Sequence, residues 1–141
     1  MSRESRKIEN AMLVVVRDIV REAQLKSWQA LTSSTPVDTG HARSGWIPTV
    51  TSPASDVLIP DPDKDVATAQ ARARNRRNAA TAQTIFGSYR LEQGESFLTN
   101  PVPYLKYLNM GTSSQAPEMF VERAITKALN SIRRVRRISI N

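Results

Sequence analysis

The chain has 141 residues, of which 40% are hydrophobic and 23% are charged, and its net charge is +7. These values fit one globular domain with a modest, mostly aliphatic core. The chain has no cysteine, which excludes disulfides, thiolate metal sites and a cysteine nucleophile. The longest apolar run, residues 11–16, is too short to span a bilayer, and we expect a protein made in the cytosol.

The first predicted element is a long helix that begins near Ser2 or Ser5, either of which is a candidate N-cap. An apolar stripe recurs at steps of three or four residues: Ile8, Met12, Val15, Ile19 and Ala23, widened by Val16 and Val20. The helix is expected to end within residues 32–35, because this polar cluster precedes Pro36 and the residue before a proline disfavours helical backbone.

A turn and a strand are expected next. Residues 36–40, with the sequence PVDTG, predict an ordered turn, because proline fixes one torsion, aspartate bonds to nearby backbone and glycine accepts a positive φ. Residues 42–50 predict a strand that includes Trp46 and Ile47. Pro48 favours an edge position or a bulge for this strand.

Residues 61–83 are expected to form an exposed excursion from the domain. The stretch is rich in alanine and arginine and almost lacks large apolar residues. Alanine favours a helix, but there is no apolar stripe to bury, so the segment is either a solvated helix or a mobile loop. It carries a first arginine cluster: Arg72, Arg74, Arg76 and Arg77.

Two further strand-like segments, residues 84–89 and 96–100, flank a turn at Gly94 and predict a hairpin. A short helical piece is then expected over residues 104–110, with Gly111 as its stop.

The last predicted helix begins at Pro117, a residue type that is favoured at the first helical position. Its apolar stripe is Val121, Ile125, Ala128, Ile132 and Val135. A second arginine cluster follows, and it consists of Arg133, Arg134, Arg136 and Arg137. Residues 138–140 alternate and predict a terminal strand. The chain as a whole, residues 1–141, is predicted to be one α+β domain, in which a small antiparallel sheet packs with a long N-terminal helix and a C-terminal helix.

Motifs of catalysis and of ligand binding are missing. His41, the sole histidine, follows a turn glycine and has no second catalytic group nearby, so we expect a surface histidine. The five glycines match neither of the common nucleotide-binding patterns. Asp61, Asp63 and Asp65 lack the glycine and the closing glutamate of a calcium loop. The sequence predicts a protein that is not an enzyme and has no metal or cofactor.

Two runs of residues carry a resemblance to a known family. The first run is Pro36, Asp38, Thr39, Gly40, Arg43 and Trp46. The second run is Asn100, Pro103, Tyr104, Leu108, Asn109, Gly111, Ser114, Gln115, Ala116 and Pro117, followed by Phe120 and Val121. They resemble the PVDTG-x-x-R-x-x-W and SNxxPYAxxLNxGxSxQAPxGFV motifs of tailed-bacteriophage neck proteins, which are also called tail-completion or head–tail connector proteins.

The chain departs from these motifs at two places. Leu105 stands where the family often has alanine, and Glu118 and Met119 replace the usual small pair. We expect both departures to be tolerated as helix positions.

The resemblance implies a ring-forming subunit, commonly in six copies, in the virion neck between the capsid portal and the tail. It implies no catalysed reaction. It also implies that the subunit assembles in the bacterial host cytoplasm. The implied partners are copies of the chain itself, a portal-side connector or adaptor, the tail tube or tail terminator, and DNA that passes without sequence specificity; no membrane is implied. The motif residues are expected to serve the fold as turns, caps and core. The alternative is that residues 103–117 pack on the adjacent subunit.

A different class of function stays open on charge alone. A small basic protein with two arginine clusters is also typical of nucleic-acid binding. Within a neck ring, each cluster faces either the DNA channel or acidic surfaces of neighbouring rings. Arginine forms forked bonds to carboxylates on such surfaces. For the terminal cluster we favour acidic protein surfaces, because a helix end that the dipole favours for cations is a fixed docking point, and for the first cluster both alternatives stay open.

Overall fold

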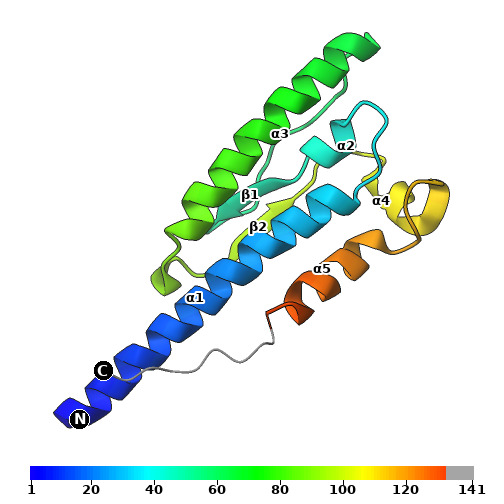
Figure 1. The fold of residues 1–141 in the computed structure, drawn as a ribbon. Coiled ribbons are helices and arrows are strands. Elements are labelled where there is room, and N and C mark those ends of the chain that lie inside the picture. The colour runs from blue at the N-terminus through cyan, green and yellow to red at the C-terminus, as the bar shows by residue number, and fades with distance from the viewer. Residues whose placement is uncertain (133–141) are drawn as a thin grey trace.

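The structure is a computed structural model, and it describes residues 1–132 (Figure 1). Its elements, in chain order, are α1 (Arg3–Ser34), α2 (His41–Ser44), β1 (Ile47–Val50), α3 (Lys64–Gly87), the 3-10 turn η1 (Leu91–Gln93), β2 (Ser96–Thr99), α4 (Leu105–Tyr107), the π-helical turn η2 (Leu108–Thr112) and α5 (Phe120–Asn130). The strands pair antiparallel, from Ile47 opposite Thr99 to Val50 opposite Ser96. The predicted α+β class, with its small antiparallel sheet and its long first and last helices, is confirmed.

The first helix organises the fold. In Figure 1, α5 lies on one side of α1, and the sheet and α3 lie on the other. Ser2 is the N-cap of α1, because its hydroxyl accepts a hydrogen bond from the Ser5 backbone N–H at 3.0 Å. The helix ends at Ser34, where Thr35 turns into extended backbone ahead of Pro36. Both ends of the predicted helix are thus explained by local chemistry.

The core gathers around the C-terminal half of α1. Its buried members are Trp28, Leu31, Trp46, Ala82, Phe86 and Ala124. The Trp28 indole N–H donates to the Trp46 carbonyl at 3.1 Å, and the Trp46 indole N–H donates to the Thr35 hydroxyl at 2.8 Å. Both indoles therefore bury their rings without leaving an unpaired N–H group.

For residues 61–83 the sequence left a solvated helix or a mobile loop open, and the structure shows a helix, although one of its faces is buried and not solvated as expected. From Lys64 they belong to α3, which Asp63 caps by accepting hydrogen bonds from the Asp65 and Val66 N–H groups. One face of α3 is buried against the rest of the domain: Ala67, Ala71, Ala82 and Phe86. The alanines of this face bury little area each, but they allow a close approach of backbones, so the part of α3 before Phe86 packs without a large buried side chain.

The predicted hairpin is also wrong. Residues 84–87 complete α3, and the chain then turns through η1 before it enters β2. The partner of β2 is β1, which lies much earlier in the sequence. Residues 41–44 form the short helix α2, so the strand predicted over residues 42–50 is reduced to Ile47–Val50.

The C-terminal region differs at the start of its helix. Helix α5 begins at Phe120 rather than at Pro117, and Met119 precedes it with a left-handed backbone. Gly111 has a φ of 94° at the end of the π-helical turn, in agreement with its predicted role as a stop. Residues 133–141, including the second arginine cluster and the predicted terminal strand, lie outside the described residues. Over residues 1–132, no helix combines the length and the apolarity that crossing a membrane requires.

Candidate functional site

The two motif-bearing segments meet in space. The Val37 backbone N–H donates to the Gln115 side-chain oxygen at 2.9 Å. A small cleft of about 140 Å³ lies between the segments, and its lining includes Pro36, Asp38, Thr39, His41, Tyr104, Leu108, Ser113 and Gln115. Residues that are some 70 positions apart in sequence therefore line one surface, and we take this surface as the candidate site; we call it the motif cleft.

The turn at residues 36–40 has the predicted geometry. Gly40 adopts a φ of 88° and is the N-cap residue of α2, whose first turn closes through Ser44 N–H to the Gly40 carbonyl at 2.9 Å. The Asp38 carboxylate is 2.9 Å from the Lys64 ammonium, and both side chains are mostly exposed. An ion pair in this setting contributes little to stability.

Arg43 and Trp46 fasten the end of α1. The Arg43 guanidinium donates to the Thr35 carbonyl at 3.1 and 3.3 Å and to the Ser33 carbonyl at 3.3 Å. The carbonyls at a helix C-terminus lack intrahelical partners, and a cation there is also favoured by the helix dipole. These two motif residues thus serve the fold.

Asn100 joins the end of β2 to α2. Its amide donates to the Ala42 carbonyl at 2.8 Å, and its side-chain oxygen accepts the Val102 N–H at 3.1 Å. A Cβ atom at Gly45 would lie 2.5 Å from the Asn100 side-chain oxygen. Gly45 is therefore required by close approach, a role that sequence reasoning missed because the contact is made 55 residues away.

Asn109 builds the start of α5. Its amide donates to the two Glu122 carboxylate oxygens at 2.9 and 3.1 Å, and its side-chain oxygen accepts the Val121 N–H at 2.9 Å. Its backbone carbonyl accepts the Met119 N–H at 2.7 Å. The hydrogen bond from Asn109 is the main cause that lowers the pKa of the Glu122 carboxyl. One asparagine thus satisfies N–H groups that a helix start leaves unpaired.

The rest of the second motif divides between core and surface. Ala116 and Phe120 are buried. The outward-facing motif members are Pro103, Tyr104, Gly111, Ser114, Gln115 and Pro117. Next to them, Tyr107 and Met110 expose 52% and 65% of their surface. Residues 103–117 therefore present aromatic and apolar side chains to the outside of the subunit.

His41 is buried, which corrects the expectation of a surface histidine. Its Nε2 lies 3.3 Å from the Leu58 carbonyl, and its Nδ1 lies 3.4 Å from a guanidinium nitrogen of Arg74, which also donates to the Ser44 hydroxyl at 2.8 Å. Because Arg74 offers only donors, Nδ1 accepts and Nε2 carries the proton of a neutral ring. Burial lowers the pKa of His41, the Leu58 hydrogen bond opposes this, and the charge of Arg74 lowers it further.

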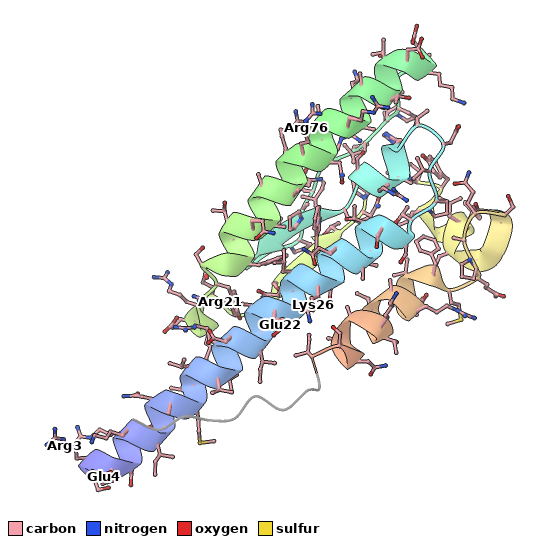
Figure 2. The ribbon with its side chains drawn as sticks, viewed as in Figure 1. Arg3, Glu4, Arg21, Glu22, Lys26 and Arg76 are labelled. Atoms are coloured by element: carbon pink, nitrogen blue, oxygen red, sulfur yellow. The ribbon has the colours of Figure 1, made fainter. Side chains whose placement is uncertain are left out.

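The first arginine cluster is divided by the helix that carries it. Arg74 points inward to His41 and Ser44, and burial followed by the charge of Arg77 lowers its pKa. Arg72 lies at a groove of about 290 Å³ between α3 and residues 37–44. Arg76 and Arg77 are exposed, and Figure 2 shows Arg76 on α3 away from α1. Arg133, Arg134, Arg136 and Arg137 are outside the described part of the chain.

Within residues 1–132, no three histidine, aspartate or glutamate side chains are grouped as a metal site would need. No family model matches the chain, and comparisons with curated proteins and with solved structures find no significant match.

Proposed function

We propose that the chain is a structural, non-enzymatic subunit of the neck of a tailed bacteriophage. Copies of it, six in number, form a ring at the head–tail junction that joins or completes the tail and leaves a channel for DNA. Its partners are its own copies, a portal-side connector, and tail tube or tail terminator proteins. The ring resides in the virion and is assembled in the host cytoplasm.

The meeting of the two motif stretches is the observation that carries this proposal. The hydrogen bonds from Val37 to Gln115 and from Asn100 to Ala42 tie the first motif stretch, residues 36–46, to the second. The two stretches resemble the family independently of each other, and their contact in the fold gives them one shared surface.

The exposed aromatic surface beside the motif cleft supports assembly. Tyr104, Tyr107 and Met110 are each at least 40% exposed. Exposed apolar groups that are gathered in one place mark sites of contact with another protein. This supports packing of residues 103–117 on a neighbouring subunit.

The proposal is tested in the phage that encodes the chain. When the gene is disrupted, we expect lysates to contain DNA-filled heads and separate tails by electron microscopy. A wild-type copy supplied in trans restores complete virions. Normal virions without the gene, or empty heads in place of filled ones, would contradict a role in joining.

Nucleic-acid binding is the second candidate, and the exposed positions of Arg72, Arg76 and Arg77 on α3 favour it. A binding module of this kind stays near 15.7 kDa and shifts duplex DNA in a gel. Its affinity falls by about 0.9 log units per log unit of salt for each phosphate that it neutralises. A subunit that assembles into a large particle and shows no such salt-dependent binding excludes this candidate.

A further inference from the structure

The N-terminal half of α1 projects beyond the rest of the fold, and we call residues 3–20 the arm (Figure 1). All residues of α1 that are buried lie after the arm: Gln24, Ser27, Trp28, Leu31 and Thr32. Six large aliphatic residues of the arm are each exposed by 38–53%: Ile8, Met12, Leu13, Val14, Val16 and Ile19. Four residues of the stripe that the sequence pattern identifies, Ile8, Met12, Val16 and Ile19, are thus exposed, whereas Val15 and Val20 are half-buried.

The directions of these side chains define the surface. Successive residues of a helix are rotated by about 100°, so Met12, Leu13 and Val14 point to three different sides. Ile19 and Trp28 lie about 180° apart around the axis, so the stripe faces away from the subunit's own core. Residues 11–16 are apolar on all sides of the helix, and a helical segment of that kind is normally buried. The middle of the arm therefore favours contacts on more than one side over a single flat partner.

The surface area of the arm is large enough for a stable contact when two neighbouring copies cover it. Residues 3–20 form a rod about 27 Å long and about 10 Å across. One neighbour that covers half of its circumference buries on the order of 400 Å², and two neighbours bury on the order of 800 Å², which is the area that each partner of a stable complex typically contributes.

The charge of the arm is compatible with copies of itself. It carries four basic residues, Arg3, Arg6, Lys7 and Arg17, and three acidic residues, Glu4, Glu9 and Asp18. Four minus three gives a net charge of +1, whereas the chain as a whole carries +7. Figure 2 shows Arg3 and Glu4 together at the tip. Like arms do not repel one another strongly, and an acidic surface or nucleic acid gains little from binding here.

We infer that each arm packs between the arms of two adjacent copies, so that the assembled ring carries a sleeve of parallel helices. The parallel direction rests on the proposed function, because copies related by rotation about a ring axis all point the same way along it. Packing against neighbouring copies does not depend on the phage role, and it is open to a separate test.

The first experiment measures mass by light scattering across a range of concentrations. The wild-type chain is expected at several times 15.7 kDa. The double variant Met12→Glu/Val16→Glu is expected at the mass of one chain, with unchanged helicity and tryptophan fluorescence, because both side chains lie outside the core of the subunit. The control is Ile59→Glu, which places one glutamate at an apolar residue that is 80% exposed away from the arm, and it is expected to assemble normally.

Each other result of this experiment overturns the inference. A double variant that keeps the wild-type mass shows that the arm is not the contact, and a wild-type chain that stays single at every concentration shows that copies do not pair. Dissociation by Ile59→Glu alone would move the contact to the loop before α3. Flotation of the wild-type chain with phosphatidylserine vesicles, lost in the double variant, would assign a lipid surface instead.

The second experiment uses the absence of cysteine from the chain. The variants Ile8→Cys and Ile19→Cys each introduce one thiol, and a short bismaleimide reagent links thiols on helices packed about 8–10 Å apart. Parallel arms give cross-linked Ile8→Cys chains by themselves. Cross-links only in a mixture of the two variants would show antiparallel arms, and so would refute the sleeve. The two proposals can fail separately. If the arms cross-link in parallel but the phage still joins heads and tails without the gene, the neck role is refuted and the packing of the arms is not.

Discussion

Gly40 and Met119 both have a left-handed backbone, with φ of 88° and 59°, but only one of them is glycine. A side chain in this region costs about 1–2 kcal/mol. In the sequence motif on which the proposed neck function rests, glycine stands at the position of Met119. The expectation that Met119 is an ordinary helix position is therefore wrong, because it lies before the first turn of α5.

We predict that Met119→Gly stabilises the subunit by about 1 kcal/mol, because it removes the strain at this position. Urea unfolding should give a higher midpoint at an unchanged slope. The matched control is Glu118→Gly, since the backbone of Glu118 is not left-handed. An equal gain in the control, or no gain in Met119→Gly, would contradict the strain argument.

We predict that Gly40→Val lowers the free energy of unfolding by about 2 kcal/mol or more, since a β-branched residue tolerates a positive φ poorly. A new Cβ would itself make only an ordinary contact with the Ala71 side chain at 3.4 Å, so the strain at this atom comes from the positive φ of the backbone. Gly87→Val is the control, because Gly87 has open space around it and no positive φ. Equal melting temperatures for the two variants would refute the turn geometry.

We predict that the free energy of unfolding decreases in mild acid because of His41. Its pKa is lowered in the folded chain, mainly by burial, from a usual value of 6.5. As the pH falls through 6.5 towards the folded value, the unfolded chain takes up a proton that the folded chain does not, so the free energy of unfolding decreases.

Urea titrations between about pH 7 and about pH 5 measure this slope. His41→Gln keeps a polar side chain but cannot titrate, so its slope over the same window should be smaller. The same slope in both proteins would assign the pH dependence to other groups.

At the scale of elements, periodicity succeeds where large side chains repeat. It found α1 and α5, although it placed the start of α5 three residues early because Pro117 is favoured at helix starts. It failed for α3, because the buried face consists of alanines, such as Ala67 and Ala71, as far as Ala82, and its one large buried residue, Phe86, lies in the last turn. It failed again at residues 84–87, where Ile85 and Phe86 are equally typical of a strand.

The sequence predicted which residues belong to the candidate site but not which contacts they make. Local rules predicted the turn at residues 36–40 and the stop at Gly111, whereas the other motif residues were named only from the resemblance. The contacts of Asn100 with Ala42 and of Arg74 with Ser44 join separate elements, and their spacing carries no local signal. The burial of His41 follows from the position of α3, which the sequence did not reveal.

Hydrogen exchange separates the two long helices. In the dissociated subunit we predict slow exchange in α3 near Ala71 and Ala82, which are fully packed, and fast exchange in the arm, which has no core contacts. The arm should become protected on assembly. Fast exchange throughout α3 would restore the mobile-loop interpretation of residues 61–83.

At the scale of the whole molecule, the second arginine cluster has two possible partners, acidic surfaces of a neighbouring ring and DNA. Reversal of Arg133 and Arg134 to glutamate is predicted to leave heads and tails separate, if the cluster meets acidic surfaces on a neighbouring ring. The prediction rests on sequence, since these residues lie outside the described part. Electron microscopy of lysates is the measurement, with Arg76→Glu/Arg77→Glu as a control of equal charge on α3. Normal joining with slowed DNA release would place the cluster at the channel instead.

Helix α1 runs without interruption for 32 residues, from the exposed arm into the core, and its sequence contains neither glycine nor proline. Such a helix has no residue that commonly produces a kink, so a displacement of the arm at Ile8 is passed along the helix to Trp28 and Leu31 in the core. Holding the arm therefore also holds the core, and whatever binds only the folded arm raises the melting temperature of the subunit by mass action. If copies pack through the arm as proposed, the subunit becomes more resistant to heat in the same step in which it assembles.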